Sequence, residues 1–152
     1  CGCRPTLAVM RSPAELTEAF RQRGLKVTPQ RQLIFRLLDQ NCAHPSAEAL
    51  FEAASSAMPG ISLRTVYQTL NDLAEMGELR LLDLGTGAAR FDPNVGDHHH
   101  LVCNNCGEVR DVHVRGSEHL EPSETNHGFV LDAAEIVFRG QCARCAAGFT
   151  PS

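Results

Sequence analysis

The 152-residue sequence contains no apolar run near the roughly 18 residues of a membrane-spanning helix, and no apolar segment typical of a secretory signal peptide. It has no internal repeat and no low-complexity segment, which excludes repeat architectures and a mainly disordered chain. It has no excess of positive charge, since 14 Lys and Arg face 18 Asp and Glu. These absences favour a globular protein of the cytoplasm, with one ordinary domain or two small ones.

The charge is unevenly distributed along the chain. Residues 93–152 carry four arginines against eight acids, which accounts for the whole net charge of −4. Residues 1–92 carry ten basic and ten acidic side chains. Within them, residues 21–36 hold five basic side chains and no acid, a local footprint of the kind that phosphate contacts need. A solvated helix face would show the same composition.

Helix-start signals recur through the first half of the sequence, each followed by apolar residues at helical spacing. The candidate N-caps are Ser12, Thr28, Ser46 and Ser62. After the last helix the pattern shortens to a hairpin, with residues 79–84 and 88–92 on either side of Gly85-Thr86-Gly87. Short helices followed by a two-stranded wing predict a winged helix-turn-helix.

In that architecture the helix before the wing, residues 63–76, enters the DNA major groove. The side chains near its N-terminus that would reach base edges are Arg64, Thr65, Tyr67 and Gln68. The alternative is a small helical domain in which Tyr67 is half-buried packing.

The overall expectation is an α+β chain in three parts. Residues 1–92 form the winged-helix DNA-binding domain, with 1–11 as a tail and Met10 as a plausible start. Residues 93–97 are a hinge. Residues 98–152 form a small α/β domain with strands over 98–103, 108–114 and 129–138, and a helical or irregular piece over 116–126. The last strand would bury an apolar face of Val130, Ala134, Ile136 and Phe138.

Two C-x2-C pairs stand out in the second domain, Cys103/Cys106 and Cys142/Cys145. Thiolates at this spacing reach one tetrahedral ion from a tight turn, and two pairs complete a four-coordinate zinc. A closed shell of four thiolates leaves no open position, so this zinc is expected to be structural. A secreted disulfide scaffold is the alternative, but the regular pairs and the histidines beside them favour metal.

Histidines and carboxylates supply a second, different ligand set. His98 and His100 are two residues apart on a predicted strand and therefore point to one face. Asp92 at the end of the wing, Asp111 on the next strand and His44 at a break between helices are candidates to join them. Such a nitrogen and oxygen shell suits Fe(II), Mn(II) or Zn(II).

His99 points to the opposite face of the same strand. A third metal group could form there from Asp97, His99, Glu118 and His127. Cys42 is unpaired by spacing and is interpreted as a buried small hydrophobic residue.

Several stretches together resemble the ferric uptake regulator (Fur) family of bacterial metal-dependent repressors. They are residues 24–31, 44–47, 62–67, 90–92 and 98–103, with both cysteine pairs. The pattern is most similar to the peroxide-sensing PerR branch, which includes actinobacterial catalase regulators. The sensing shell of that branch falls here on His44, Asp92, His98, His100 and Asp111. Iron-sensing members usually place glutamates where this chain has the two aspartates.

The resemblance implies a cytoplasmic bacterial homodimer that represses genes by binding double-stranded operator DNA, and no enzyme activity. It places Arg64 and Tyr67 on the DNA and Lys26 near its backbone or minor groove, although Arg64 replaces the small residue usual there. It implies structural Zn(II) and regulatory Fe(II) or Mn(II), with Zn(II) able to substitute. With Fe(II), hydrogen peroxide would oxidise His44 or His98 and release the DNA. An iron or zinc homeostasis sensor without peroxide chemistry is the alternative.

Overall fold

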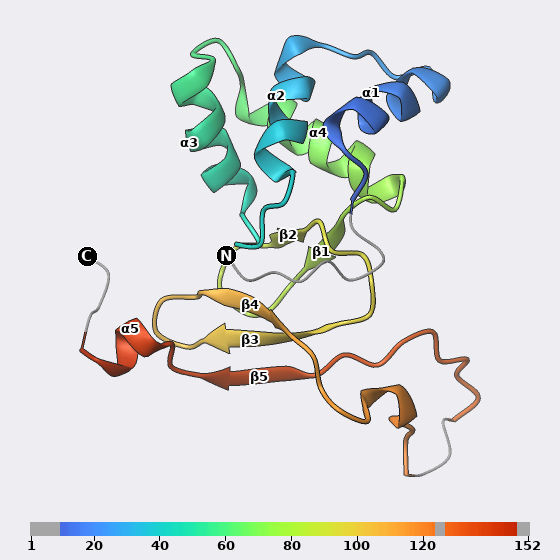
Figure 1. Cartoon of the computed structure of the whole chain (residues 1–152), viewed down its shortest axis with the longest axis vertical. Helices are drawn as coiled ribbons and strands as arrows, with labels where there is room; N and C mark the ends of the chain where they lie inside the picture. The colour runs from blue at the N-terminus through green and yellow to red at the C-terminus, as the bar shows by residue number, and fades with distance from the viewer. Residues whose placement is uncertain (1–9, 124–126, 149–152) are drawn as a thin grey trace. The chain divides into compact units, whose positions relative to one another are not determined.

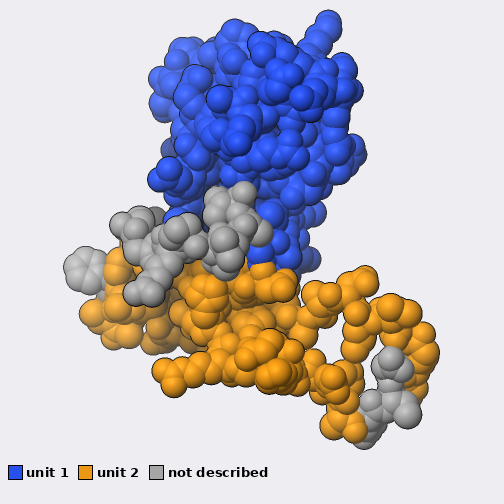
Figure 2. Space-filling model, turned by 45° about the vertical axis from the view of Figure 1, so that its right-hand side comes forward, with its two compact units in different colours: residues 1–96 blue, residues 97–152 orange. Residues whose placement is uncertain are grey.

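The computed structural model describes residues 10–123 and 127–148 and divides the chain into two compact units, residues 1–96 and 97–152 (Figures 1 and 2). Among the described residues, no helix has both the length and the apolar character needed to cross a membrane.

Over its described residues, 10–96, the first unit contains four helices and a two-stranded hairpin. In chain order these are α1 (Pro13–Gln22), α2 (Pro29–Leu38), α3 (Ala47–Ala57), α4 (Leu63–Glu75), β1 (Arg80–Leu82) and β2 (Arg90–Asp92). The hairpin is antiparallel, with Leu81 opposite Phe91. Four helices followed by this wing confirm the predicted winged-helix fold.

Each of the four helices begins at the residue expected from the sequence. The side chains of Ser12, Thr28, Ser46 and Ser62 accept a hydrogen bond from the backbone N–H three residues on. At Ser12 the capping box is complete, because Glu15 also accepts from the Ser12 backbone N–H at 2.9 Å. These contacts satisfy N–H groups that have no partner within the helix, so the helix starts are determined locally.

Apolar side chains from the helices form the core of the first unit. Phe20 of α1 and Phe35 of α2 pack edge to face, with ring centroids 4.8 Å apart. Leu70 and Leu73 of α4 are fully buried in the same cluster. This packing holds the other face of α4 toward solvent, where Arg64, Tyr67 and Gln68 are exposed.

The segment just before α1 belongs to the core of this unit. Met10 is buried, and its backbone N–H donates to the carbonyl oxygen of Pro93 at 2.9 Å. Arg11 makes an ion pair of 2.9 Å with the buried carboxylate of Glu78. The remainder of the expected tail, residues 1–9, lies outside the described residues.

The second unit is built on a three-stranded sheet of order β4-β3-β5. Its elements are β3 (His99–Cys103), β4 (Val109–Val112), η1 (Ser117–His119), β5 (Val137–Gly140) and α5 (Ala143–Ala146). β3 pairs antiparallel with β4 and parallel with β5. The expected piece at 116–126 is a single 3-10 turn over its described part, and residues 124–126 lie outside the described residues.

The strand predicted over residues 129–138 is wrong for most of its length. Only Val137 onward is a strand, and Val130 of the expected apolar face is 88% exposed. The register explains the difference, because Val137 lies opposite His100 and β3 begins at His99. Residues before Ile136 would therefore pair with residues before His99, which are not part of β3. Without a partner strand they do not form a strand.

Candidate metal centres

The four cysteines of the second unit converge on one point. Cys103 ends β3 and Cys106 lies in the turn after it, while Cys142 caps α5 and Cys145 lies within that helix. Their sulfurs all lie within 4.8 Å of one another. The Cys106 and Cys142 sulfurs are 3.7 Å apart, close to the edge of about 3.8 Å expected for a tetrahedron with zinc–sulfur bonds of about 2.3 Å. The cysteines therefore fit a zinc ion.

The electrostatics of this cluster also favour a cation. Backbone N–H groups, first that of Cys106 and then that of Cys142, lower the pKa of Cys103 to about 6. Burial is the main cause that raises the pKa of Cys145 to about 12, and hydrogen bonds with the other cysteines raise it further. Cys103 therefore ionises easily to the thiolate, whereas Cys145 in the same cluster favours the neutral thiol. A bound cation would stabilise the thiolate form of every ligand.

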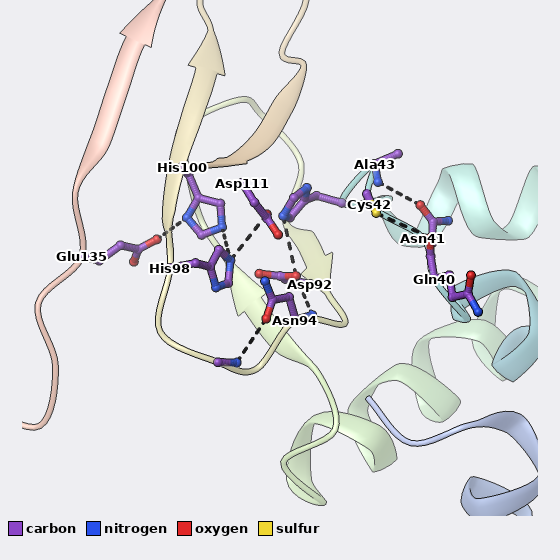
Figure 3. A network of polar contacts seen from close by, with 12 residues as sticks. Gln40, Asn41, Cys42, Ala43, Asp92, Asn94, His98, His100, Asp111 and Glu135 are labelled. Carbon is purple, nitrogen blue, oxygen red and sulfur yellow. Dashed lines mark hydrogen bonds and ion pairs between the residues drawn. The ribbon is translucent and has the colours of Figure 1, made fainter. Parts of the chain in front are cut away.

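A second cluster lies at the opposite end of β3. The Nε2 atoms of His98 and His100 are 3.0 Å apart, and both rings are buried. Asp111 lies opposite His100 across the β3–β4 ladder, and its carboxylate is 3.5 Å from His98 Nε2 (Figure 3). The two imidazoles point to one face of the strand, as predicted. These nitrogen and oxygen atoms form a ligand set for a divalent transition metal.

The first unit also holds a buried histidine beside a buried carboxylate, His44 and Asp92. His44 precedes Pro45 in the α2–α3 connection, and its backbone has a left-handed φ of 48°. The carbonyl oxygen of Pro45 accepts from the Phe91 N–H of β2 at 3.0 Å. That bond brings His44 beside Asp92, with Nε2 and Oδ1 3.6 Å apart and both side chains buried. A non-glycine residue in this conformation is uncommon, and such residues gather at functional sites.

Hydrogen bonds from the connection after β2 hold the Asp92 carboxylate in place. The Asn94 backbone N–H donates to Asp92 Oδ1 at 2.8 Å, and the Asn94 side chain accepts from the Gly96 N–H at 3.3 Å (Figure 3). The carboxylate is thus oriented by its own loop.

The third predicted metal group does not form a close ligand cluster among the described residues. Asp97, His99 and Glu118 line one open cavity of about 780 Å³ in the second unit, together with His113. His127 is exposed and is not among the residues lining that cavity. His99 Nδ1 instead accepts a hydrogen bond from the Ile136 N–H at 3.1 Å. The third site therefore stays a prediction.

Cys42 differs from its expected state. The side chain is half-buried rather than part of a core, and it is disulfide-bonded rather than unpaired. Its position in the turn after α2, beside the Gln40 carbonyl oxygen at 3.6 Å, explains why the core does not enclose it.

Of the predicted DNA-contacting side chains on α4, Arg64, Tyr67 and Gln68 are exposed and Thr65 is half-buried. Tyr67 is 41% exposed, and its hydroxyl donates to the Glu48 carboxylate of α3 at 2.6 Å. This hydrogen bond raises the pKa of Tyr67 and lowers the pKa of Glu48. Lys26 is exposed between α1 and α2. Val66 and Leu70 on the opposite face of α4 are buried.

Sequence analysis missed two acidic residues that contact candidate functional side chains, Glu48 beside Tyr67 and Glu135 beside His100. Glu48 is 19 residues from Tyr67, and Glu135 is 35 residues from His100, whose Nδ1 it contacts at 2.7 Å. Spacing rules apply to helices, strands and turns, so they miss pairs formed only by tertiary packing.

Comparison with known sequences decides the family. The ferric uptake regulator family model matches residues 22–139.

The chain belongs to the ferric uptake regulator family.

The resemblance expected from the sequence is thereby confirmed. This Fur-family chain is 32% identical over 133 residues to the peroxide operon regulator of Bacillus subtilis strain 168, covering 87% of this chain and 92% of that protein. It is 37% identical over 134 residues to the peroxide-responsive repressor PerR of Staphylococcus aureus strain Mu50, covering 86% and 89%. The Helicobacter pylori ferric uptake regulator superposes with a TM-score of 0.73 at 18% identity, covering 91% of this chain and 96% of that one, which shows a shared fold.

Family membership makes the chain a metal-dependent transcriptional regulator. Members of the Fur family are DNA-binding proteins. The winged helix of the first unit and the two kinds of ligand cluster agree with that role.

Proposed function

We propose that this protein is a DNA-binding repressor that requires a bound metal and senses hydrogen peroxide. The observation that carries the proposal is the separation of two ligand chemistries. One group consists of four cysteines, which fill all four positions around a tetrahedral ion. The other group consists of imidazoles and carboxylates, and both carboxylates are aspartates. The peroxide regulators reported above, to which the chain is 32% and 37% identical, support the same assignment.

In this proposal the two clusters have different roles. Cys103, Cys106, Cys142 and Cys145 hold a structural Zn(II), which compensates for the thin core of the second unit. His98, His100 and Asp111 from the second unit hold the regulatory ion together with His44 and Asp92 from the first. That ion is Fe(II) or Mn(II), and Zn(II) can substitute because an N/O shell of this kind does not exclude it.

The regulatory ligands come from both units, and this connects metal binding to DNA binding. An ion held by all five side chains would restrict the angle between the units at the hinge, residues 93–97. The difference in metal affinity between the restricted and the free arrangement is the coupling free energy. In a homodimer, which we propose forms through the second unit, the same restriction sets the spacing of the two α4 helices.

We assign the DNA contacts to α4 and to the connection between α1 and α2. Arg64, Thr65, Tyr67 and Gln68 face base edges of the operator duplex, and Lys26 contacts the sugar-phosphate backbone or the minor groove. We further propose that the protein acts in the bacterial cytoplasm and catalyses no reaction on a substrate. Five protein ligands leave the regulatory ion little room to bind one.

The peroxide response consists of losing a ligand. Fe(II), when bound, would supply reactivity toward hydrogen peroxide. One peroxide oxygen would be added to a neighbouring imidazole ring, and the other would leave as water. His44 and His98 are the candidates, since each lies next to a carboxylate ligand. An oxidised ring no longer donates its nitrogen lone pair in the same way, so the units separate and the operator is released.

Peptide mass spectrometry of Fe(II)-loaded protein before and after dilute hydrogen peroxide tests this proposal. Cleavage after arginine places His44 in the peptide 37–64 and His98 in 91–110, apart from His113, His119 and His127. We expect one added oxygen on 37–64 or 91–110, with iron only. An Mn(II)-loaded sample is the control. Absence of histidine oxidation in zinc-replete protein would contradict peroxide sensing and leave a reversible iron or zinc homeostasis sensor.

A further inference from the structure

Glu135 contacts His100 on the side of the ring that faces away from the ligand cluster. Its Oε1 lies 2.7 Å from His100 Nδ1, whereas His100 Nε2 faces His98 (Figure 3). Asp111 approaches the cluster from the other direction and reaches His98 Nε2 itself. A carboxylate at Nδ1 does not share an ion held at Nε2 of the same ring, so Glu135 stands outside the ligand set.

The backbone holds Glu135 in this place by contacts that involve no metal. The next residue, Ile136, accepts from the His100 N–H at 3.0 Å and donates its own N–H to His99 Nδ1 at 3.1 Å. The parallel ladder of β3 and β5 then starts with His100 opposite Val137. Ile136 and Val137 are therefore fixed against the ligand strand, and Glu135 directly precedes them.

The hydrogen bond has a chemical consequence for the imidazole. A carboxylate only accepts, so the proton of a neutral His100 lies on Nδ1, and the lone pair lies on Nε2. An imidazole that donates its far N–H to a carboxylate also binds a metal more strongly, because the carboxylate fixes the ring orientation and raises the basicity of the ligating nitrogen. His100 is almost fully buried, whereas the Glu135 side chain is 47% exposed.

We propose that Glu135 is a positioning residue for the regulatory metal site, which it serves by holding His100 with Nε2 directed at the ion. This inference rests on the proposed function, since it assumes that the cluster binds a divalent cation. Removing the carboxylate is expected to weaken metal binding about 10- to 100-fold, the range for such outer partners. The four-cysteine zinc site lies at the other end of β3 and is expected to be unaffected.

The test compares Glu135→Ala and Glu135→Gln in the full-length protein with its zinc site filled. Glutamine keeps an acceptor oxygen and loses the charge. Asp132→Ala is the matched control, because it removes an exposed acid from the same segment. The first readout is Mn(II) affinity by electron paramagnetic resonance. The second is the visible d–d spectrum of added Co(II), which reports the ligand geometry and which a purely structural role would not alter.

We expect Glu135→Ala to lose affinity and to change the Co(II) spectrum, and Glu135→Gln to recover most of both. Asp132→Ala is expected to match the unsubstituted protein. Equal affinities and spectra for all four proteins would overturn the role of Glu135 and leave the proposed function standing. An unsubstituted protein that binds neither Mn(II) nor Co(II) outside its zinc site would overturn the proposed function, and this inference with it.

Discussion

The hydroxyl of Tyr67 on α4 donates a 2.6 Å hydrogen bond to the carboxylate of Glu48 on α3. The bond links the proposed DNA-reading helix to its neighbour at the exposed surface. Tyr67 is the single tyrosine of the chain, and the chain has no tryptophan. Its ionisation can therefore be followed by absorbance without interference from another residue.

We expect the pKa of Tyr67 to lie above its ordinary value, because the bond to Glu48 favours the protonated phenol. Glu48→Gln should lower that pKa toward the ordinary value, as measured by the tyrosinate absorbance during alkaline titration. Glu52→Gln, an exposed acid one turn further along α3, is the control. An identical titration of the Glu48 variant and the parent would contradict the bond in solution.

The same bond predicts how pH affects stability. The carboxyl pKa of Glu48 is lowered in the folded protein, so its contribution is present above the unfolded value and is lost as pH falls through the folded one. The pKa of Tyr67 is raised in the folded protein. Its contribution to stability is therefore present below the unfolded-state pKa and is lost as pH rises through the folded-state pKa. The stability difference between the parent and Glu48→Gln should therefore shrink at both extremes of pH. Chemical denaturation across the pH range measures it.

Removing His44 tests the bridging role of the regulatory ion. His44→Ala should abolish the dependence of operator binding on added Mn(II), because Asp92 then remains as the one proposed ligand among the described residues of the first unit. Fluorescence anisotropy of a labelled operator duplex measures the binding. His119→Ala removes a histidine whose side chain is 84% exposed, and it should behave like the parent. Metal-dependent binding by His44→Ala equal to that of the parent would refute the bridge.

Zinc binding to the four cysteines should depend on pH in a specific way. The pKa of Cys103 is lowered to about 6, so that thiol is already ionised at neutral pH but protonated in more acidic solution. Below about pH 6, binding one zinc ion should release one proton more than above it. The logarithm of zinc affinity should therefore rise more steeply with pH below this value. Competition with a chelator across the pH range measures the slope, and a constant slope would contradict the shifted thiol.

Arg31 and Asp72 form an ion pair of 2.7 Å between α2 and α4, with side chains only 12% and 19% exposed. The Arg31 guanidinium also lies 5.2 Å from the ring centroid of Phe20. Arg31→Ala should cost about 3 kcal/mol of unfolding free energy, because Asp72 is left largely buried and unpaired. Urea denaturation measures the loss.

The exposed pair Glu18 and Arg21 provides the comparison for that prediction. Its atoms are 3.6 Å apart, and both side chains are more than half exposed. Glu18→Ala should cost less than about 1 kcal/mol, since water and salt screen such a pair. Equal losses for Arg31→Ala and Glu18→Ala would show that the buried pair adds no specific stability.

Features that depend on neighbours along the chain were predictable. The caps at Ser12 and Ser62 and the common face of His98 and His100 follow from hydrogen-bond reach and strand periodicity. The strand expected at Val130 was not, because strand formation needs a partner backbone. Val137 pairs with His100 near the start of β3, so Val130 would have to pair with a residue that precedes β3.

The amino-acid sequence by itself determined the ligand chemistry, because side-chain type and short spacing decide what an ion can bind. It supplies four thiolates in two C-x2-C pairs and a separate group of imidazoles and carboxylates. The tertiary structure decided which distant groups serve them. Glu135 meets His100 because β5 pairs with β3, and Pro45 meets Phe91 because the α2–α3 connection packs on the wing. Such contacts depend on burying an apolar core and pairing backbones far apart in the chain, and no local pattern encodes that register.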